Sequence, residues 1–165
     1  MKRPSALVTG ATSGIGEVFA TFLAEQGYDL VIVARDEARL NQRASQWRSH
    51  HGVDVEILRA DLSNHQDISK VAARLSDQNR PIDVLINNAG FGINKGFSSS
   101  TSQEEQALLD VLVTAPMRLM HAVLPIMKER DEGIIINVSS VAGWIAGGTY
   151  SAAKSYLTVL TESLH

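Results

Sequence analysis

The stretch ALVTGATSGIG, residues 6–16, decides the fold, because a short apolar run passes directly into a glycine-rich turn. A continuous apolar run of this length is typical of a strand buried on both faces of a sheet. Gly10, Gly14 and Gly16 follow it with the spacing G-x-x-x-G-x-G. Glycine permits a tight turn and lets backbone N–H groups approach a phosphate, which any Cβ would hold away. The stretch therefore predicts a strand, a dinucleotide-binding turn and the start of a helix, with a glycine-rich loop that binds no ligand as the alternative.

The same alternation of apolar run and helical pattern continues to the end of the chain. The expected strands are 6–9, 29–34, 53–58, 83–87 and 133–138, and the expected helices are 15–25, 36–50, 64–77, 102–130 and a last one from residue 149. This order predicts a doubly wound parallel α/β sheet, a Rossmann fold with three αβα layers, whose ligands bind at the carboxyl ends of the strands. The alternating run 53–58 suggests an edge strand, and Ser102 with Glu105 suggests a capping box.

Length and composition favour one globular domain over residues 1–165, with 44% hydrophobic residues and a net charge of -3. The mild acidity gives no reason to expect a nucleic acid or a membrane as partner, and no unbroken apolar run is long enough to span a bilayer. The chain has no cysteine, which excludes disulfides and thiolate chemistry and fits a cytoplasmic location. His50 and His51 precede Gly52 at an expected helix end without a third ligand nearby, so we expect no metal site.

Five short motifs, in this order, resemble those of the short-chain dehydrogenase/reductase family. They are the glycine turn, DL at 61–62, NNAG at 87–90, NVSS at 137–140, and a tyrosine and a lysine four residues apart at 150 and 154. The resemblance covers essentially the whole chain. It implies an oxidoreductase that binds a nicotinamide dinucleotide and moves hydride between it and a small-molecule carbonyl or secondary alcohol. Members are usually longer, so it also implies that the C-terminal third, which shapes the substrate pocket, is missing.

The resemblance assigns the cofactor contacts residue by residue. Asp61 falls where the family contacts the adenine amino group, although it could simply be a polar residue ahead of a helix cap at Ser63. The NNAG segment runs along the cofactor in the family, although Asn and Gly also form plain turns. The implied contacts are Gly10, Thr12, Ser13, Gly14, Ile15, Gly16, Arg35, Asp61, Leu62, Asn88, Ala89, Gly90, Tyr150 and Lys154.

Arg35, directly after the second expected strand, bears on the choice between NADP(H) and NAD(H). A cation there favours a 2′-phosphate, whereas an acid would favour the free 2′-hydroxyl. With Ser13 in the glycine turn as a second contact, Arg35 favours NADP(H) over NAD(H). Asp36 is the counter-evidence, unless it serves as the N-cap of the next helix. Arg39 and Arg43 are interpreted as part of a solvated helix face.

Tyr150 and Lys154 stand one helical turn apart, so both side chains can share a face. A tyrosine, with an ordinary pKa near 10, is a poor acid–base at neutral pH unless a nearby cation stabilises the phenolate. By resemblance, Tyr150 is the general acid–base, Lys154 lowers its pKa and holds the nicotinamide ribose, and Ser140 orients the carbonyl, with Ser139 as the fallback. An isolated pair with this spacing also occurs by accident on surface helices.

The chain departs from the family pattern at two places. Ser140 precedes Tyr150 by only ten residues, a shorter interval than usual, and Gly147 and Gly148 could absorb the tighter path. Leu112 stands where the family usually carries an asparagine that acts through its backbone, so we predict a catalytic site of three residues. Leu112 also favours the competing hypothesis, a non-catalytic protein that binds a dinucleotide or pairs with a partner through the long helix.

Met117, Met120 and Met127 lie on an expected helix that is apolar on most sides and so needs cover on two faces. The sheet covers one face. The family pairs two helices of each subunit in its dimer interface, so the resemblance implies a homo-oligomer, a dimer or tetramer, through residues 102–130 and 149–165. The alternative is that the last helix alone covers the second face.

Overall fold

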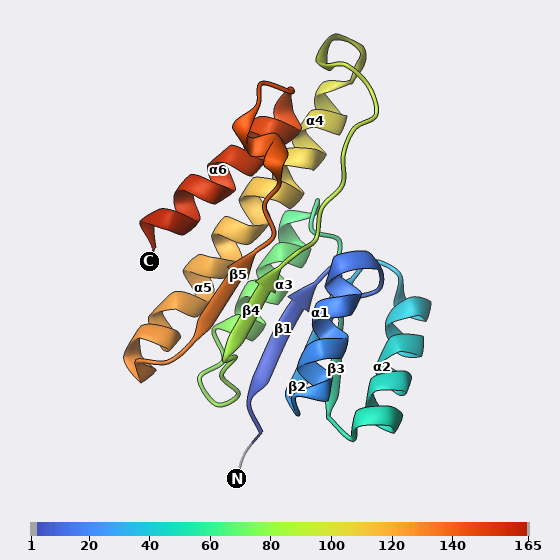
Figure 1. The fold of residues 1–165 in the computed structure, drawn as a ribbon, viewed down its shortest axis with the longest axis vertical. Helices are drawn as coiled ribbons and strands as arrows, with labels where there is room; N and C mark the ends of the chain where they lie inside the picture. Colours follow the sequence, from blue (N-terminus) through green and yellow to red (C-terminus); the bar gives the residue numbers. More distant parts are fainter. Residues whose placement is uncertain (1–2, 165) are drawn as a thin grey trace.

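The computed structural model describes residues 3–164 and consists of one parallel sheet between two layers of helices (Figure 1). The strands pair in the order β3-β2-β1-β4-β5. The strands are β1 Ser5–Thr9, β2 Asp29–Ala34, β3 Val55–Arg59, β4 Val84–Asn87 and β5 Ile134–Asn137. The main helices are α1 Gly14–Glu25, α2 Glu37–His51, α3 His65–Leu75, α4 Ser102–Leu109, α5 Ala115–Arg130 and α6 Thr149–Ser163. The predicted strands and helices are confirmed, and β3 is at an edge as expected.

Two hydrophobic cores, one on each face of the sheet, produce the three layers. Alternate residues of a strand point to opposite faces, and β1 divides its side chains in this way. Ala6 and Val8 pack with buried residues of α1 and α2, whereas Leu7 packs with buried residues of α3, α5 and α6. Both faces of the central strands are therefore covered, which explains their unbroken apolar sequences.

Side-chain caps fix where several helices begin. Asp36 accepts a hydrogen bond from the Arg39 N–H at 3.0 Å and caps α2, which confirms that alternative for Asp36. The cap of α3 is Asn64 and not Ser63, because the Asn64 side chain accepts from two N–H groups of the first turn. The predicted capping box at Ser102 is wrong by one residue. Thr101 caps α4 in exchange with Glu104, and Ser102 is already helical.

Residues 102–130 form one continuous helical stretch, as predicted, but with a π-helical turn inside it. This turn, η2 Asp110–Thr114, separates α4 from α5. The stretch is long and apolar enough to cross a membrane by length and composition, yet half of its most apolar window is buried within the fold. That burial is the behaviour of a core helix that packs against a sheet.

The β5 edge of the sheet is less covered than its centre. Three residues of β1 next to one another are fully buried, whereas Ile134 of β5 is 54% exposed. Two short 3-10 helices, η1 Phe97–Ser99 and η3 Val141–Trp144, lie in the loops at the carboxyl ends of β4 and β5. Val141 and Trp144 of η3 are also exposed.

Candidate active site

The carboxyl ends of the strands open into a cleft of about 1170 Å³. Gly14 and Gly16 are the two predicted site residues that do not line this cleft. Those that line it are Gly10, Thr12, Ser13, Ile15, Arg35, Asp61, Leu62, Asn88, Ala89, Gly90, Ser140, Tyr150 and Lys154. The structure therefore brings together, at one edge of the sheet, residues that are far apart in the sequence.

The glycine turn leaves the start of α1 open toward the cleft. Gly10 and Gly14 have φ angles of 68° and 56°, in the left-handed region that favours glycine. A Cβ on Gly16 would overlap the carbonyl oxygen of Gly10, so Gly16 lets α1 pack onto the turn. Ser13 precedes α1 but makes no side-chain capping bond, unlike the caps of α2, α3 and α4. The N–H groups and positive dipole end of α1 therefore fit a pyrophosphate.

Thr9 and Asn88 lock the NNAG segment onto the glycine turn. The Thr9 hydroxyl accepts from the N–H groups of Asn88 and Ala89, at 3.0 and 3.1 Å. The Asn88 side chain donates to the carbonyls of Thr9 and Gly10, at 3.0 and 3.3 Å. Asn88 is thus held by the protein as well as facing the cleft, and the two loops form one rigid floor.

Arg35 is the free cation at the far end of the cleft. Among residues 3–164 it has no hydrogen bond or ion pair, and it is exposed. Asp36 is engaged by α2, since it caps the helix and pairs with Arg39 at 3.5 Å. Arg43 was expected on a solvated face, but it forms an ion pair with Glu17 of α1 at 2.7 Å and is one-third exposed. Arg35 is therefore available to an anionic ligand, while its neighbours are occupied.

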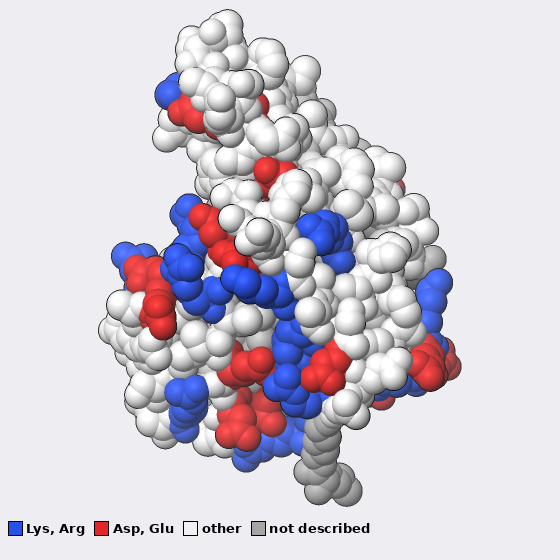
Figure 2. Space-filling model, turned by 180° about the vertical axis from the view of Figure 1, so that it is seen from behind, with Lys and Arg blue, Asp and Glu red and all other residues white. Residues whose placement is uncertain are grey.

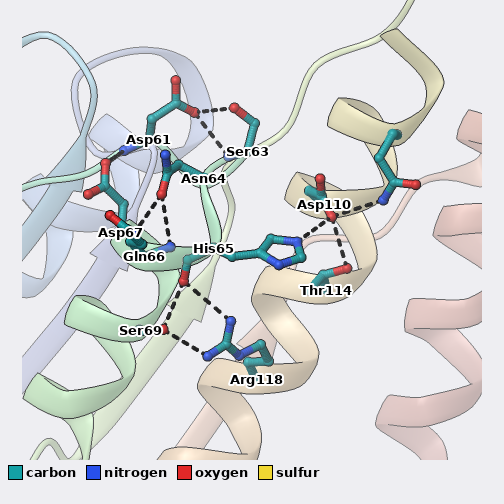
Figure 3. Close-up of polar contacts among 11 residues, drawn as sticks. Asp61, Ser63, Asn64, His65, Gln66, Asp67, Ser69, Asp110, Thr114 and Arg118 are labelled. Atoms are coloured by element: carbon teal, nitrogen blue, oxygen red, sulfur yellow. Dashed lines mark hydrogen bonds and ion pairs between the residues drawn. The ribbon is translucent and has the colours of Figure 1, made fainter. Parts of the chain in front are cut away.

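Asp61 begins a tightly bonded loop between β3 and α3 (Figure 3). Its carboxylate accepts from the N–H and the hydroxyl of Ser63, at 3.0 and 2.7 Å. Its own N–H donates to Asp67 at 2.9 Å. This hydrogen bond and the one from Lys70 lower the pKa of Asp67. The loop is thus fixed from both sides, which holds Asp61 at the wall of the cleft.

Within residues 3–164, Lys154 is one of the few polar residues that are buried, with 5% exposure. Its ammonium donates to the carbonyl of Val138 at 2.5 Å and lies 5.8 Å from the centre of the Tyr150 ring. Burial lowers the pKa of Lys154. Tyr150 and Lys154 share one face of α6, and a buried cation interacts more strongly with a nearby charge than it would in water.

The two candidate serines differ in what their hydroxyls already contact. Ser139 is bonded to the hydroxyl of Thr158 at 2.6 Å and to the carbonyl of Lys154 at 3.2 Å. Ser140 accepts one bond, from the Ala142 N–H at 3.2 Å, and its own proton is free to be donated. Both line the cleft, but Ser140 is the one with a donor left for a ligand.

Glycines let the short loop between Ser140 and Tyr150 lie tightly against α6. A Cβ on Gly143 would come within 3.0 Å of the backbone nitrogen of Ser155. One on Gly147 would come within 2.7 Å of the Ser151 hydroxyl. Gly148 has a φ of 80° and directly precedes α6. The loop thus favours glycine at 143 and 148, and a side chain at 147 would have to displace the Ser151 hydroxyl.

Leu112 occupies the inner side of the π turn and is almost fully buried. Its Cδ2 atom lies 2.9 Å from the place where a Cβ on Gly90 would be. With Lys154 and Asn87 it also lines a cavity of about 10 Å³, close to the space that one water needs. Leu112 therefore packs where the family pattern has an asparagine. The backbone at this position forms the π-helical turn η2.

Sequence reasoning missed the residues that hold the site together without contributing to the predicted chemistry. Thr9 fastens the NNAG segment, and Asn87 of β4 donates to Asn137 of β5 at 2.8 Å. Asn137 in turn donates to Thr161 of α6 at 2.9 Å. Each strand residue is a polar side chain at the carboxyl end of a mostly apolar strand, and this pattern could have singled them out.

Comparison with known proteins matches this geometry. The family model described as short chain dehydrogenase covers residues 4–165. An uncharacterized oxidoreductase of Staphylococcus saprophyticus is 31% identical over 162 residues, which are 96% of this chain and 69% of that protein. The chain thus spans about two thirds of the length of this curated relative.

Two solved structures share the fold closely. A bulky-bulky ketone specific alcohol dehydrogenase from Comamonas testosteroni has a TM-score of 0.96 and 36% identity, over 99% of this chain and 67% of that one. A short-chain dehydrogenase from Sphingobium yanoikuyae in complex with NADPH has a TM-score of 0.94 and 40% identity, over 98% and 64% of the two chains. This chain therefore belongs to the short chain dehydrogenase family, whose oxidoreductases act on CH–OH and C=O groups.

Proposed function

We propose that this chain is an NADP(H)-dependent oxidoreductase in which Tyr150 acts as the general acid–base on a carbonyl or secondary alcohol. The observation that carries the proposal is that Tyr150 and Lys154 line the same cleft as the glycine turn and the uncapped start of α1. When bound, the nicotinamide dinucleotide supplies or accepts the hydride. Residues 10–15 hold its pyrophosphate, Arg35 its 2′-phosphate, Asp61 its adenine and Lys154 its nicotinamide ribose.

The proton follows a path through the protein's own side chains. In the reducing direction, the Ser140 hydroxyl donates a hydrogen bond to the carbonyl oxygen of the substrate and orients it. Tyr150 transfers its phenolic proton to that oxygen as negative charge develops. Lys154 stabilises the phenolate left behind, because its ammonium lies 5.8 Å from the ring centre and the Lys154 side chain is buried. In the oxidising direction each step runs in reverse.

The preference for NADP(H) over NAD(H) rests on Arg35, the unpaired cation that lines the cleft. The NADPH in the Sphingobium yanoikuyae relative lends support. Hydrogen bonds to a charged group contribute about 1.5–3 kcal/mol, so Arg35→Ala should weaken NADPH binding about 10- to 150-fold and leave NADH binding unchanged. Fluorescence titration of both cofactors checks this. Tighter binding of NADH that Arg35→Ala does not alter would contradict the preference.

Turnover tests the catalytic part of the proposal. We expect NADPH oxidation with at least one member of a ketone panel that includes ketones with two bulky substituents, since the relative from Comamonas testosteroni is specific for them. Tyr150→Phe should lower kcat/KM about 10²–10⁴-fold, the usual contribution of a general acid, with a much smaller effect on NADPH affinity. Equal turnover with and without the phenol would show that Tyr150 is not the acid–base.

A non-catalytic dinucleotide-binding protein is the second candidate. Leu112, in place of the family's asparagine, favours it, because leucine offers no polar side chain to the cavity behind Lys154. This candidate predicts tight NADPH binding without turnover of any ketone or alcohol. Wild-type turnover that Tyr150→Phe removes would exclude it.

We also propose that the protein acts in the cytoplasm as a single-domain homo-oligomer whose contacts lie on α4, α5 and α6. Met117, Tyr156 and Val159 are large apolar side chains exposed on α5 and α6. Figure 2 supports this, because charged side chains crowd the lower part of the rear face and are sparse in the upper part, where α4 lies. Light scattering should give at least the mass of a dimer, and a monomer at high concentration would contradict the assembly.

A further inference from the structure

Asp110 is a buried acid that the proposed chemistry does not use. Among residues 3–164, Asp110 and Lys154 are the charged residues that are buried as whole residues, with 6% and 5% exposure. The Asp110 carboxylate is 8% exposed. One of its oxygens faces three potential donors, His65 Nε2 at 3.0 Å, Gln106 Nε2 at 3.1 Å and Thr114 Oγ1 at 3.4 Å. A buried carboxylate with this many partners is held in one position.

The three partners fasten the π turn from both of its ends. Asp110 is the first residue of the turn and Thr114 the last. Gln106 lies one turn earlier, in α4. A π turn is rare and frequently occurs at functional sites. His65 is the partner from outside this helix, and it is the first residue of α3 (Figure 3).

The opposite side of the same turn forms the wall beside Lys154. Val111 lines the large cleft and, with Leu112, the small cavity behind Lys154. Leu112 also packs against the position of Gly90 in the NNAG segment. A shift of the π turn would therefore move the apolar side chains that hold Lys154 and Gly90 in place.

His65 is anchored on a rigid base. It follows the loop in which Asp61 bonds Ser63 and Asp67, and Asn64 caps the helix that His65 begins. The His65 ring is 64% exposed, so it contributes little to the core. What it supplies is a hydrogen bond from the fixed start of α3 to the turn.

We propose that Asp110 and His65 are positioning residues that fix the π turn and thereby keep the Lys154 end of the cleft in shape for the nicotinamide ribose. The inference rests on the proposed nicotinamide cofactor. Asp110 and His65 do not touch the cofactor; they act through Val111 and Leu112.

Arg118 offers a matched control for simple docking of the helices. Its guanidinium donates to the His65 carbonyl at 3.4 Å and to the Ser69 hydroxyl at 2.9 Å. It thus joins α5 to α3, as His65 joins the π turn to α3, but it does not contact Asp110. If helix docking alone mattered, losing Arg118 or losing His65 would have similar consequences.

The experiment compares binding of the whole cofactor with binding of its adenine end. Dissociation constants of NADPH and of 2′,5′-ADP are measured for the wild type and for Asp110→Ala, His65→Ala and Arg118→Ala. Asp110→Ala and His65→Ala should weaken NADPH about tenfold, within the range by which distant positioning residues alter binding. 2′,5′-ADP, which does not reach Lys154, should keep its affinity. Arg118→Ala should change neither constant.

Conservative variants complete the test. Asp110→Asn keeps an acceptor and His65→Gln keeps a donor at the place of Nε2, so both should restore NADPH affinity to nearly that of the wild type. Equal weakening of NADPH and 2′,5′-ADP would overturn the proposal, as would the same loss in Arg118→Ala or no rescue by these variants. If Asp110→Ala does not unfold cooperatively, the exposed His65 and its two variants decide the question.

Failure of the proposed cofactor would be recognised separately. If wild-type protein binds 2′,5′-ADP no tighter than 5′-AMP, which lacks only the 2′-phosphate, the 2′-phosphate site is wrong. The same variants are then compared with NADH and 5′-AMP. A selective loss of NADH still supports the positioning role, and an equal loss of both ligands overturns it.

Discussion

The chain has two tryptophans, and they lie in two halves that are built differently. Trp47 on α2 is 4% exposed, and its indole N–H donates to the Thr21 hydroxyl of α1 at 3.0 Å. Trp144, at the end of η3, is 76% exposed. Trp47 joins α1 and α2 over a closed core. Trp144 lies in the loop between Ser140 and Tyr150 and is in contact with solvent.

The same difference runs through the sheet. Buried apolar residues fill β1 and β2, while every residue of β5 is at least partly exposed. The nucleotide half, which we define as β1 to β3 with α1 to α3, is held together by a continuous core. The catalytic half, β4 and β5 with α4 to α6, has a core of its own. At the exposed β5 edge individual contacts add to that core, such as Asn137 with Thr161 and Gly143 against α6. Stability and catalysis should therefore respond to substitutions in different halves.

The largest expected effect on stability comes from substituting the buried Trp47. Trp47→Ala should lower the free energy of unfolding by about 3–5 kcal/mol, because it leaves a cavity in a closed core. Urea denaturation followed by circular dichroism measures the change. Trp47→Phe is the control and should lose distinctly less, since it keeps most of the volume. A loss below about 1 kcal/mol for Trp47→Ala, the level of ordinary surface changes, would show that the nucleotide half is not a tightly packed core.

A comparison of two helix starts in the nucleotide half gives the next effect. Asn64 caps α3 with two hydrogen bonds, so Asn64→Ala should cost about 1 kcal/mol of stability. Ser13 precedes α1 without a capping bond, so Ser13→Ala should leave apo stability unchanged while it weakens NADPH binding. Chemical denaturation and cofactor titration of both variants are needed. The account of α1 as an open anion site fails if Ser13→Ala destabilises the apo protein as much as Asn64→Ala does.

A substitution of Lys154 should show that the buried lysine of the candidate active site lowers the stability of the folded protein. Burial lowers the pKa of Lys154, so the folded protein binds this proton less well than the unfolded chain does. At pH 7 the buried ammonium is destabilising, and the penalty decreases as pH rises through the lowered pKa toward the ordinary lysine value. Lys154→Met should therefore stabilise the apo protein at pH 7 by about 1 kcal/mol. The gain should shrink by about pH 10, near the ordinary lysine pKa, and a gain that grows with pH would contradict this sign.

The smallest effect belongs to the exposed tryptophan. Trp144→Ala should change the free energy of unfolding by less than about 0.5 kcal/mol, as surface substitutions do. Denaturation under the conditions used for Trp47→Ala makes the two values comparable. If the two alanine variants lose equal stability, the contrast between the halves is wrong.

The sequence was sufficient for the fold because the deciding signals are local. Short apolar runs such as residues 6–9 are typical of strands covered on both sides, and glycines or capping residues mark the ends of the helices. The capping box was misplaced by one residue because Thr101 and Ser102 carry equivalent hydroxyls. Which of them is extended depends on the path of the preceding loop, and no local propensity encodes that path.

The site residues could be predicted from motifs. The contacts that hold these residues in place could not be predicted from the sequence. His65 and Asp110 are separated by 45 positions, and Arg43 pairs with Glu17 of another helix. Such pairs depend on how the helices lie on the sheet, which residue types alone do not specify. The π turn at 110–114 has no recognised sequence signature, and its helical pattern looks continuous.

The most direct test of the central claim follows the hydride itself. Wild-type protein is incubated with a ketone from the panel and with NADPH that carries deuterium at the transferable position of the nicotinamide. We predict deuterium on the carbinol carbon of the product by mass spectrometry, and almost none with Tyr150→Phe. Protein that binds NADPH but yields no labelled product with any ketone, or equal labelling by Tyr150→Phe, would contradict the account.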